Sequence, residues 1–194
     1  MPILQQQPAV YPPTLLSNST DPATVRQATD EVENQRAWWA VYTRSRQEKS
    51  LARKLYANQV PFYLPLVPHE HLYRKRKVKS YIPLFSSYLF LFGTDNERIA
   101  ALTTNCVSRM LPVDDKERLF HDLLNIHQLI DSRAPMTVEQ RLQPGRLVRI
   151  KSGSLKGVEG VVIERRGQNR LLVVVDYIQQ GVSMAIEDFM VEPV

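Results

Sequence analysis

Apolar and polar positions divide the chain into a polar start, a mixed central region and a β-rich end. Residues 1–35 are rich in Gln, Pro, Ser, Thr and Asn and show no apolar periodicity. Such a segment buries too little apolar surface to offset the conformational entropy lost on ordering. We therefore expect a disordered tail over 1–35, with order beginning at the tryptophan-rich run 36–45, which is typical of a buried strand.

The central region, residues 36–131, predicts an α+β domain with the order β-α-β-β-β-α-β-α. Apolar residues at helical spacing indicate an amphipathic helix over 46–58, and Ser45 with Glu48 has the spacing of a capping box. Asp95 is the expected cap of a second, short helix. The remaining expected elements are strands at 38–43, 62–66 and 86–92, two strand arms joined by a basic loop within 69–84, a strand at 108–113, the short helix at 95–104 and a longer one at 115–130.

The last part of the chain is predicted to be entirely strands and turns. Pro135 and the polar residues around it favour a linker over 132–141. From residue 142 onward, short apolar runs alternate with turns, and four or five such strands in about 50 residues are typical of a small closed β-barrel. The expected fold is therefore an α+β domain, a linker and a C-terminal barrel over 142–194.

The stretch SGSLKGVEGVV, residues 152–162, holds three of the seven glycines in the chain. They are Gly153, Gly157 and Gly160, spaced too closely for a stable helix, in which each glycine costs roughly 1 kcal/mol. Glycine is favoured where φ is positive or where two backbones approach closely. The stretch is therefore predicted to be a turn between two strands.

Composition narrows the functional classes. The 194 residues carry a net charge of +5, and residues 36–131 alone hold 15 basic and 9 acidic side chains, so this domain suits a polyanionic partner. The single cysteine, Cys106, excludes an internal disulfide and is expected to be buried. With neither an apolar run of about 20 residues nor a signal peptide, a cytoplasmic protein is expected. The sequence contains no metal-ligand set, phosphate loop or catalytic motif, so we predict a protein without enzymatic activity or cofactor.

The glycine-rich stretch resembles the KOW motif, a strand–loop–strand element of small barrels in transcription and ribosomal proteins. The matching positions, within residues 144–164, are Arg149, Lys151, Gly153, Lys156, Gly157, Gly160 and Val161. Upstream, WWAVYTRSRQEKSLARKL, IPLFSSYLFLFG and VSRMLPV resemble successive segments of the NusG N-terminal (NGN) domain. An NGN domain followed by a linker and a KOW domain is the NusG architecture, so the chain resembles the NusG family of transcription elongation and antitermination factors.

One departure and the long tail favour a specialised paralog, similar to RfaH, over the housekeeping member. Where the family usually has Pro-Gly or Pro-Asn before the tyrosine, this chain has Ser86 and Ser87. This replacement changes the turn before Tyr88 and leaves the strand that follows unchanged.

The resemblance implies two contacts with RNA polymerase. The first is an apolar depression that docks on the β′ clamp helices, which maps onto Leu84, Phe85, Tyr88 and Phe90. The second is a threonine-rich stretch that touches the β-subunit gate loop, which maps onto Thr103 and Thr104. Plain core packing of the apolar residues and simple helix capping by the threonines are the alternatives.

Nucleic-acid contact is predicted at two places. The segment YRKRKVK holds five cations, and cations at a hairpin tip can bind phosphates of upstream DNA or nascent RNA; the alternative is a solvated charged surface. The resemblance adds a region where specialised paralogs touch the non-template strand. The hairpin candidates are Arg74, Lys75, Arg76, Lys77 and Lys79, and the candidates implied by the resemblance are Arg44, Arg46 and Gln47.

The C-terminal barrel is predicted to be permanent and tethered flexibly, because the valines of 173–175 and the glycines of 152–162 disfavour helix. The resemblance implies a second partner, a ribosomal protein or Rho, contacted through Tyr177, Ile178 and Gln179. Two hypotheses therefore stand: a monomeric elongation or antitermination factor that bridges polymerase, or an RNA- or ribosome-binding KOW protein that does not bind polymerase.

Overall fold

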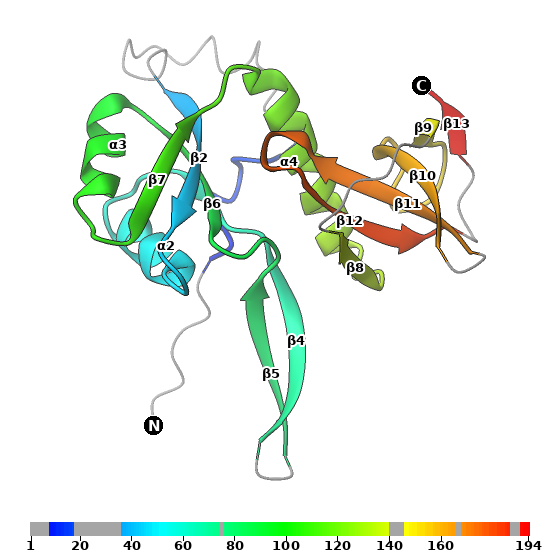
Figure 1. Ribbon diagram of the computed structural model, residues 1–194, viewed down its shortest axis with the longest axis horizontal. Helices are drawn as coiled ribbons and strands as arrows, with labels where there is room; N and C mark the ends of the chain where they lie inside the picture. Colours follow the sequence, from blue (N-terminus) through cyan, green and yellow to red (C-terminus); the bar gives the residue numbers. More distant parts are fainter. Residues whose placement is uncertain (1–7, 18–35, 74–75, 140–145, 166–167, 187–190) are drawn as a thin grey trace. The chain divides into compact units, whose positions relative to one another are not determined.

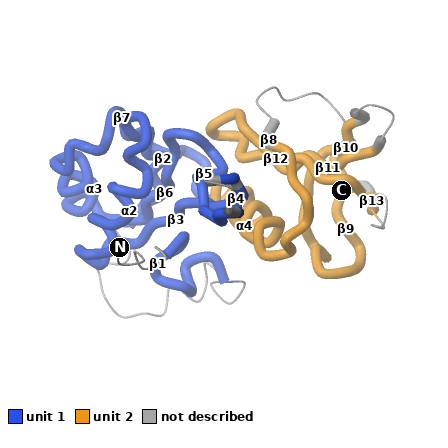
Figure 2. Tube along the Cα trace, turned by 90° about the horizontal axis from the view of Figure 1, so that it is seen from below, with its two compact units in different colours: residues 1–116 blue, residues 117–194 orange. Residues whose placement is uncertain are grey.

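The computed structural model describes residues 8–17, 36–73, 76–139, 146–165, 168–186 and 191–194. The chain forms two compact units, residues 1–116 and 117–194 (Figure 2). The first is an antiparallel sheet with helices and the second combines one helix with a separate antiparallel sheet, which confirms the predicted α+β fold class.

The first unit is built on a five-stranded sheet in the order β1-β3-β6-β2-β7, with every neighbouring pair antiparallel. Helices α2 and α3 belong to the same unit (Figure 1). The bounds are β1 Val10–Tyr11, β2 Ala37–Thr43, α2 Glu48–Ala57, β3 Phe62–Tyr63, β6 Tyr88–Gly93, α3 Asp95–Leu102 and β7 Val107–Pro112.

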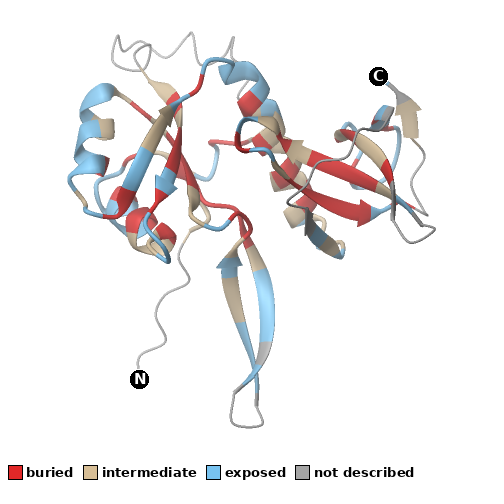
Figure 3. Cartoon of the chain, in the orientation of Figure 1, coloured by how far each residue is buried: buried red, intermediate tan, exposed pale blue. Residues whose placement is uncertain are grey.

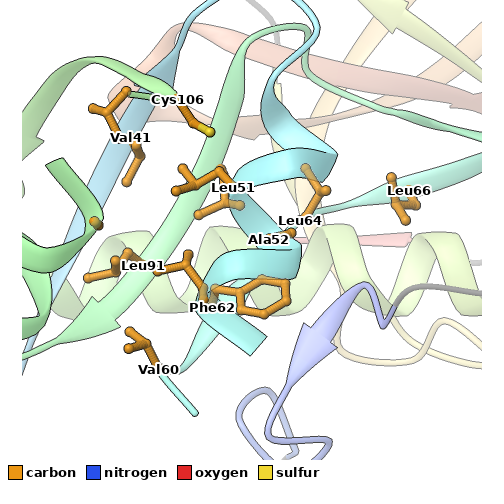
Figure 4. Close-up of a cluster of buried hydrophobic side chains, with 13 residues drawn as sticks. Val41, Leu51, Ala52, Val60, Phe62, Leu64, Leu66, Leu91 and Cys106 are labelled. Carbon is orange, nitrogen blue, oxygen red and sulfur yellow. The ribbon is translucent and has the colours of Figure 1, made fainter. Parts of the chain in front are cut away.

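One face of this sheet packs on the helices to form the core. Strand residues such as Val41 and Leu91 share a cluster with Leu51 and Leu55 of α2 and with Ala101 of α3 (Figure 4). Cys106 joins the same cluster and is 2% exposed, which confirms its predicted burial. The helices form here because their apolar residues recur at helical spacing and so gather on one side.

The opposite face of the sheet is set by strand alternation. Trp38, Ala40 and Tyr42 project to this face from β2, opposite Phe92, Phe90 and Tyr88 of β6. Trp38, Ala40 and Phe90 are buried, whereas Tyr42 at the end of the row is 41% exposed. This face therefore passes from a buried centre to an exposed aromatic end.

A hairpin of β4 (Leu66–Tyr73) and β5 (Arg76–Pro83) forms a two-stranded sheet of its own and extends away from the five-stranded sheet (Figures 1 and 3). At its base, the N–H of Leu84 donates to the carbonyl of Pro65 at 2.8 Å, and Lys49 of α2 donates to the carbonyl of Tyr81. The predicted pair of strand arms is confirmed, and its base is attached to helix α2.

The second unit contains nearly all of α4 (Lys116–Asp131) and a six-stranded antiparallel sheet in the order β13-β9-β10-β11-β12-β8. The short 3-10 helix η2, Asp176–Ile178, connects β11 to β12. The bounds are β8 Met136–Glu139, β9 Arg146–Ile150, β10 Glu159–Arg165, β11 Gln168–Val175, β12 Gln180–Ala185 and β13 Val191–Pro193. The valines of 173–175 lie in strand β11, as predicted.

The glycines of the β9–β10 connection serve two different physical needs. Gly153 and Gly157 have φ of 87° and 91°, which suits a residue without Cβ. Gly160 instead lies against β11, where an added Cβ would be 2.6 Å from the backbone oxygen of Leu172. Positive φ and close backbone approach, the two conditions that favour glycine, therefore both occur in this connection. Lys156 is exposed in the turn.

The structure corrects the predicted tail and linker. Within 1–35, residues 8–17 are part of the first unit: β1 pairs with β3, Leu15 and Leu16 are buried, and Tyr11 packs edge-on against Tyr56 with ring centroids 5.1 Å apart. Prolines at both ends of the short apolar run 9–11 hide the strand pattern, and a two-residue edge strand tolerates prolines beside it. Within the predicted linker 132–141, β8 pairs with β12, so the second sheet has six strands rather than the four or five expected. The other residues of 1–35 lie outside the described part of the chain.

Two predicted caps also differ. Ser45 does not cap α2, whose N-cap is Gln47 without a side-chain cap hydrogen bond, because Glu48 is directed to the loop before β6. Helix α3 is capped by Thr94 rather than Asp95: the Thr94 hydroxyl accepts from the N–H of Glu97, and the Glu97 carboxylate accepts from the N–H of Thr94. Thr94 forms the reciprocal pair because Glu97 stands three residues after it.

Candidate functional site

The exposed end of the first sheet carries two tyrosines, which we call the tyrosine pair: Tyr42 of β2 and Tyr88 of β6. They are register partners, and their rings meet edge-to-face with centroids 5.2 Å apart and an interplanar angle of 65°. Tyr42 is 41% exposed and Tyr88 is half-buried. Arg109 of β7 is exposed and pairs with Tyr42 from the other side. The result is a row of two aromatic residues and one cation across three strands.

The turn before Tyr88 is held by a buried carboxylate. Ser87 has φ of 64°, the left-handed region that glycine and asparagine favour, and its N–H donates to Oε1 of Glu48 at 2.7 Å. The Ser87 carbonyl accepts from the N–H of Thr43 at 2.8 Å. Ser87 therefore adopts the kind of backbone that the Pro-Gly or Pro-Asn sequence would favour, and the serine replacement does not abolish the turn.

The other predicted polymerase-binding residues occupy different surroundings. Leu84, Phe85 and Phe90 are buried, at 5%, 1% and 0% exposure, so they fit the core-packing alternative. Thr103 is the exposed C-cap of α3 and its hydroxyl donates to the carbonyl of Ala100 at 2.8 Å. Thr104 is half-buried and donates to the carbonyl of Ala101. Both threonines thus satisfy carbonyls at the C-terminal end of α3.

The basic hairpin is less uniformly charged than its sequence suggests. Lys77 and Lys79 are exposed, but the register places Glu70 directly opposite Lys79. Arg76 pairs with Tyr73 at the tip. The other two predicted cations, Arg74 and Lys75, lie outside the described residues. The acidic partner was missed because it lies four residues before the cation run and reaches it only through the hairpin register.

The candidates Arg44, Arg46 and Gln47 form the connection from β2 to α2. The N–H of Arg44 donates to the carbonyl of Cys106 at 2.8 Å, and the N–H of Gln47 donates to the carbonyl of Arg44 at 3.0 Å. Arg46 has a left-handed φ of 59°. Both arginines are exposed, so a tight turn attached to the start of β7 presents two cations to solvent.

In the second unit, the loop between β11 and β12 contacts helix α4. Tyr177 is 38% exposed, Ile178 is buried, and Gln179, also exposed, has φ of 52° and donates to the carbonyl of Asp176 at 2.7 Å. Of the three predicted partner-binding residues, Tyr177 and Gln179 are therefore accessible, while Ile178 anchors the loop in the core.

Asp176, at the start of this loop, is held by two residues of α4. Its N–H donates to Oδ2 of Asp122 at 2.9 Å, and its carboxylate lies 3.0 Å from Nη2 of Arg118. Burial raises the pKa of the Asp122 carboxyl to about 6, although the hydrogen bond from Asp176 and the charge of Arg118 oppose the rise. The contact borders a cavity of about 550 Å³. Sequence reasoning missed it because no pattern links residues 54 positions apart.

Tyr42 could have been found from the sequence. It is the third member of the alternating row Trp38, Ala40, Tyr42, and so belongs to the same face as Trp38 once the strand is accepted.

Across the described ranges, three or more His, Cys, Asp or Glu side chains nowhere gather as a metal site would require. Within those same ranges, no helix has both the length and the apolar character needed to cross a membrane.

Comparison with known proteins gives a family match and a weak likeness to solved structures. The family model described as transcription termination factor nusG matches residues 36–142. Among curated proteins, none matches. Among solved structures, a chain from "Crystal Structure of MjSpt4:Spt5 complex conformation B" is 16% identical, covers 81% of this chain and 97% of its own length, and has a TM-score of 0.25. A TM-score this low supports no argument about the arrangement of the chain.

Proposed function

The chain belongs to the NusG family, because the family model matches more than half of it, and from this premise we propose that it is a transcription elongation or antitermination factor. In this proposal the NGN domain binds RNA polymerase, the C-terminal sheet acts as a KOW domain that recruits a second partner, and the protein works by binding rather than by catalysis. The proposed location is the cytoplasm.

The tyrosine pair is the observation that carries the proposed docking. On the sheet face that carries the pair, Trp38 and Phe90 are buried, whereas Tyr42 is exposed and Tyr88 is half-buried. Tyrosine supplies a large apolar ring with a polar tip and is enriched at protein interfaces. We propose that this end docks on the β′ clamp helices, with Leu84 and Phe85 supporting it from beneath, and that Thr103 faces the β gate loop.

The nucleic-acid contacts are proposed for two cationic surfaces. The cations of the segment YRKRKVK, Arg74, Lys75, Arg76, Lys77 and Lys79, are proposed to bind the DNA or RNA backbone. Arg44, Arg46 and Gln47 are proposed to reach the non-template strand. Phosphate binding requires only exposed cations, which Arg44, Arg46, Lys77 and Lys79 provide.

The second partner is proposed to bind the loop around Tyr177 and Gln179, whose side chains are exposed. A ribosomal protein or Rho is the proposed class of partner. Assignment as a specialised, RfaH-like paralog stays a prediction: the chain has the polar N-terminal segment that motivates it, but the Ser86-Ser87 replacement supports it less, since Ser87 is left-handed.

Affinity purification of the full-length protein, followed by crosslinking mass spectrometry, tests the proposal. Recovery of polymerase subunits, with crosslinks from the β′ clamp helices to lysines of residues 36–116, is the expected result. Recovery of ribosomal subunits without polymerase would favour the alternative of an RNA- or ribosome-binding KOW protein and overturn the proposed docking.

A further inference from the structure

The β4–β5 hairpin is a free-standing ribbon with both faces exposed. Eight register pairs, from Leu66↔Pro83 to Tyr73↔Arg76, join its strands. Leu72 is 73% exposed and Val78 is 37% exposed, although both are apolar. Figure 3 shows exposed residues along both strands of the hairpin. Its outer part therefore contributes nothing to the core described above, and its exposed apolar residues call for another explanation.

The ribbon has the dimensions of a groove-binding element. Eight residues at about 3.3 Å each give strands of about 26 Å, and the two strands lie about 4.8 Å apart. The B-form DNA major groove, about 12 Å wide and 8.5 Å deep, admits a two-stranded ribbon. The minor groove, at about 6 Å, and the deep, narrow major groove of A-form RNA are too narrow for it.

The two faces of the ribbon differ in chemistry. Directly opposed residues of an antiparallel pair share a face, so Leu72 and Lys77 lie on one side together with Glu70 and Lys79. We call these four residues the lysine face. Val78 and Ser80 belong to the opposite face. Ammonium groups donate to guanine O6 and N7, a carboxylate accepts from cytosine N4, and an apolar side chain contacts the thymine methyl group. The lysine face offers all three.

We propose that the β4–β5 ribbon enters the major groove of B-form DNA with the lysine face toward the base edges. This inference rests on the proposed nucleic-acid contact of the hairpin and deepens it, by naming duplex DNA as the ligand and base edges as the surface contacted. Leu72 carries the argument, because an exposed leucine beside lysines has no use in phosphate binding but matches a thymine methyl group.

Fluorescence anisotropy with the full-length protein tests the proposal. The probes are a 20-base-pair DNA duplex, the same duplex with deoxyuridine for thymidine, the corresponding RNA duplex and the single DNA strand. We expect DNA duplex to bind at least tenfold more tightly than RNA duplex. Leu72→Ala should weaken binding to the thymidine duplex about threefold to fivefold, as expected for loss of one methyl contact.

The deoxyuridine duplex removes the methyl group and leaves the phosphates unchanged. It should weaken the wild type by the same factor as Leu72→Ala and leave the variant unaffected. Val78→Ala, a matched loss of exposed apolar surface on the opposite face, should bind as wild type does.

Equal affinity for DNA and RNA duplexes, preference for the single strand, or loss of the methyl effect without dependence on Leu72 would overturn the groove assignment. The charge variant Lys77→Gln/Lys79→Gln separates this failure from that of the proposed function. If it lowers affinity for all probes equally, phosphate contact stands and groove insertion fails. If it changes none, the hairpin does not bind nucleic acid.

Discussion

Oε1 of Glu48 accepts a hydrogen bond of 2.7 Å from the backbone N–H of Ser87, so the first residue of helix α2 fixes the turn that leads to Tyr88. Glu48 is 7% exposed and is the one buried charged side chain among the described residues. A hydrogen bond to a buried carboxylate is stronger than one between neutral groups. The position of the tyrosine pair thus depends on a contact between segments 39 residues apart.

Changing Ser87 tests the strain in this turn. Ser87→Gly should raise the free energy of unfolding by about 0.5–1 kcal/mol, because a left-handed backbone costs a non-glycine residue roughly 1–2 kcal/mol, part of which is offset by the greater freedom of unfolded glycine. Ser86→Gly, at the neighbouring position outside the left-handed region, should lower it. Urea denaturation measures both; destabilisation by both substitutions would contradict the strained turn.

Removing Glu48 should loosen the same turn. Glu48→Ala is expected to lower the free energy of unfolding by about 1.5–3 kcal/mol, the range for hydrogen bonds to charged groups. Glu48→Gln retains an oxygen acceptor and should lose less. Urea denaturation measures both losses of unfolding free energy. Equal losses for the two variants would contradict this expectation, because the oxygen acceptor kept by Glu48→Gln would then contribute nothing.

The tyrosine pair should govern polymerase binding. Tyr42→Ala and Tyr88→Ala are each expected to raise the Kd for polymerase at least tenfold, since truncation of a hot-spot aromatic residue costs about 2 kcal/mol or more. Tyr177→Ala, an exposed tyrosine of the second unit, is the control and should bind polymerase as wild type does. Surface plasmon resonance on variants with native circular dichroism gives the answer. Unchanged affinity of both Tyr42→Ala and Tyr88→Ala for polymerase would show that the tyrosine pair is not the docking surface.

Asp122 should make stability depend on pH in the direction of its shift. With a folded pKa of about 6 against an ordinary 3.8, the carboxyl binds more protons in the folded state between these values. Its stabilising contribution is therefore full below about pH 4 and lost as pH rises through 6. Asp122→Asn keeps an oxygen acceptor for Asp176, so its melting temperature relative to wild type should rise between pH 4.5 and 7.5. The exposed Asp114→Asn should show no such trend; a parallel trend would remove Asp122 as the cause.

The glycines of the β9–β10 connection should differ in tolerance. Gly160→Ala would place a Cβ 2.6 Å from the Leu172 oxygen and should cost at least about 2 kcal/mol of unfolding free energy. Gly157→Ala has nothing within 4 Å of its Cβ and bears only the cost of its φ, roughly 1–2 kcal/mol. Thermal denaturation should rank Gly160→Ala as the less stable variant; the reverse order would contradict the packing argument.

Local patterns predicted the elements better than the contacts between them. Helical spacing indicated α2 and α4, and alternation indicated β2 and β6, because both signals come from neighbours in sequence. The burial of Phe90 and the pairing of Glu70 with Lys79 were not predictable in this way. They depend on which segments meet in space. For the same reason the spacing of Ser45 and Glu48 predicts a capping box, whereas the Glu48 carboxylate binds Ser87, beyond the hairpin.

Strand β1 closes one edge of the first sheet. It pairs with β3 through Val10 and Tyr11, and the N–H of Leu64 donates to the carbonyl of Ala9 at 2.6 Å. A fragment beginning at residue 36, where the family match starts, would leave the outer donors and acceptors of β3 unpaired. Open strand edges recruit strands from other molecules. The short N-terminal strand therefore protects the domain against edge-to-edge self-association. A domain without β1 is expected to aggregate more readily.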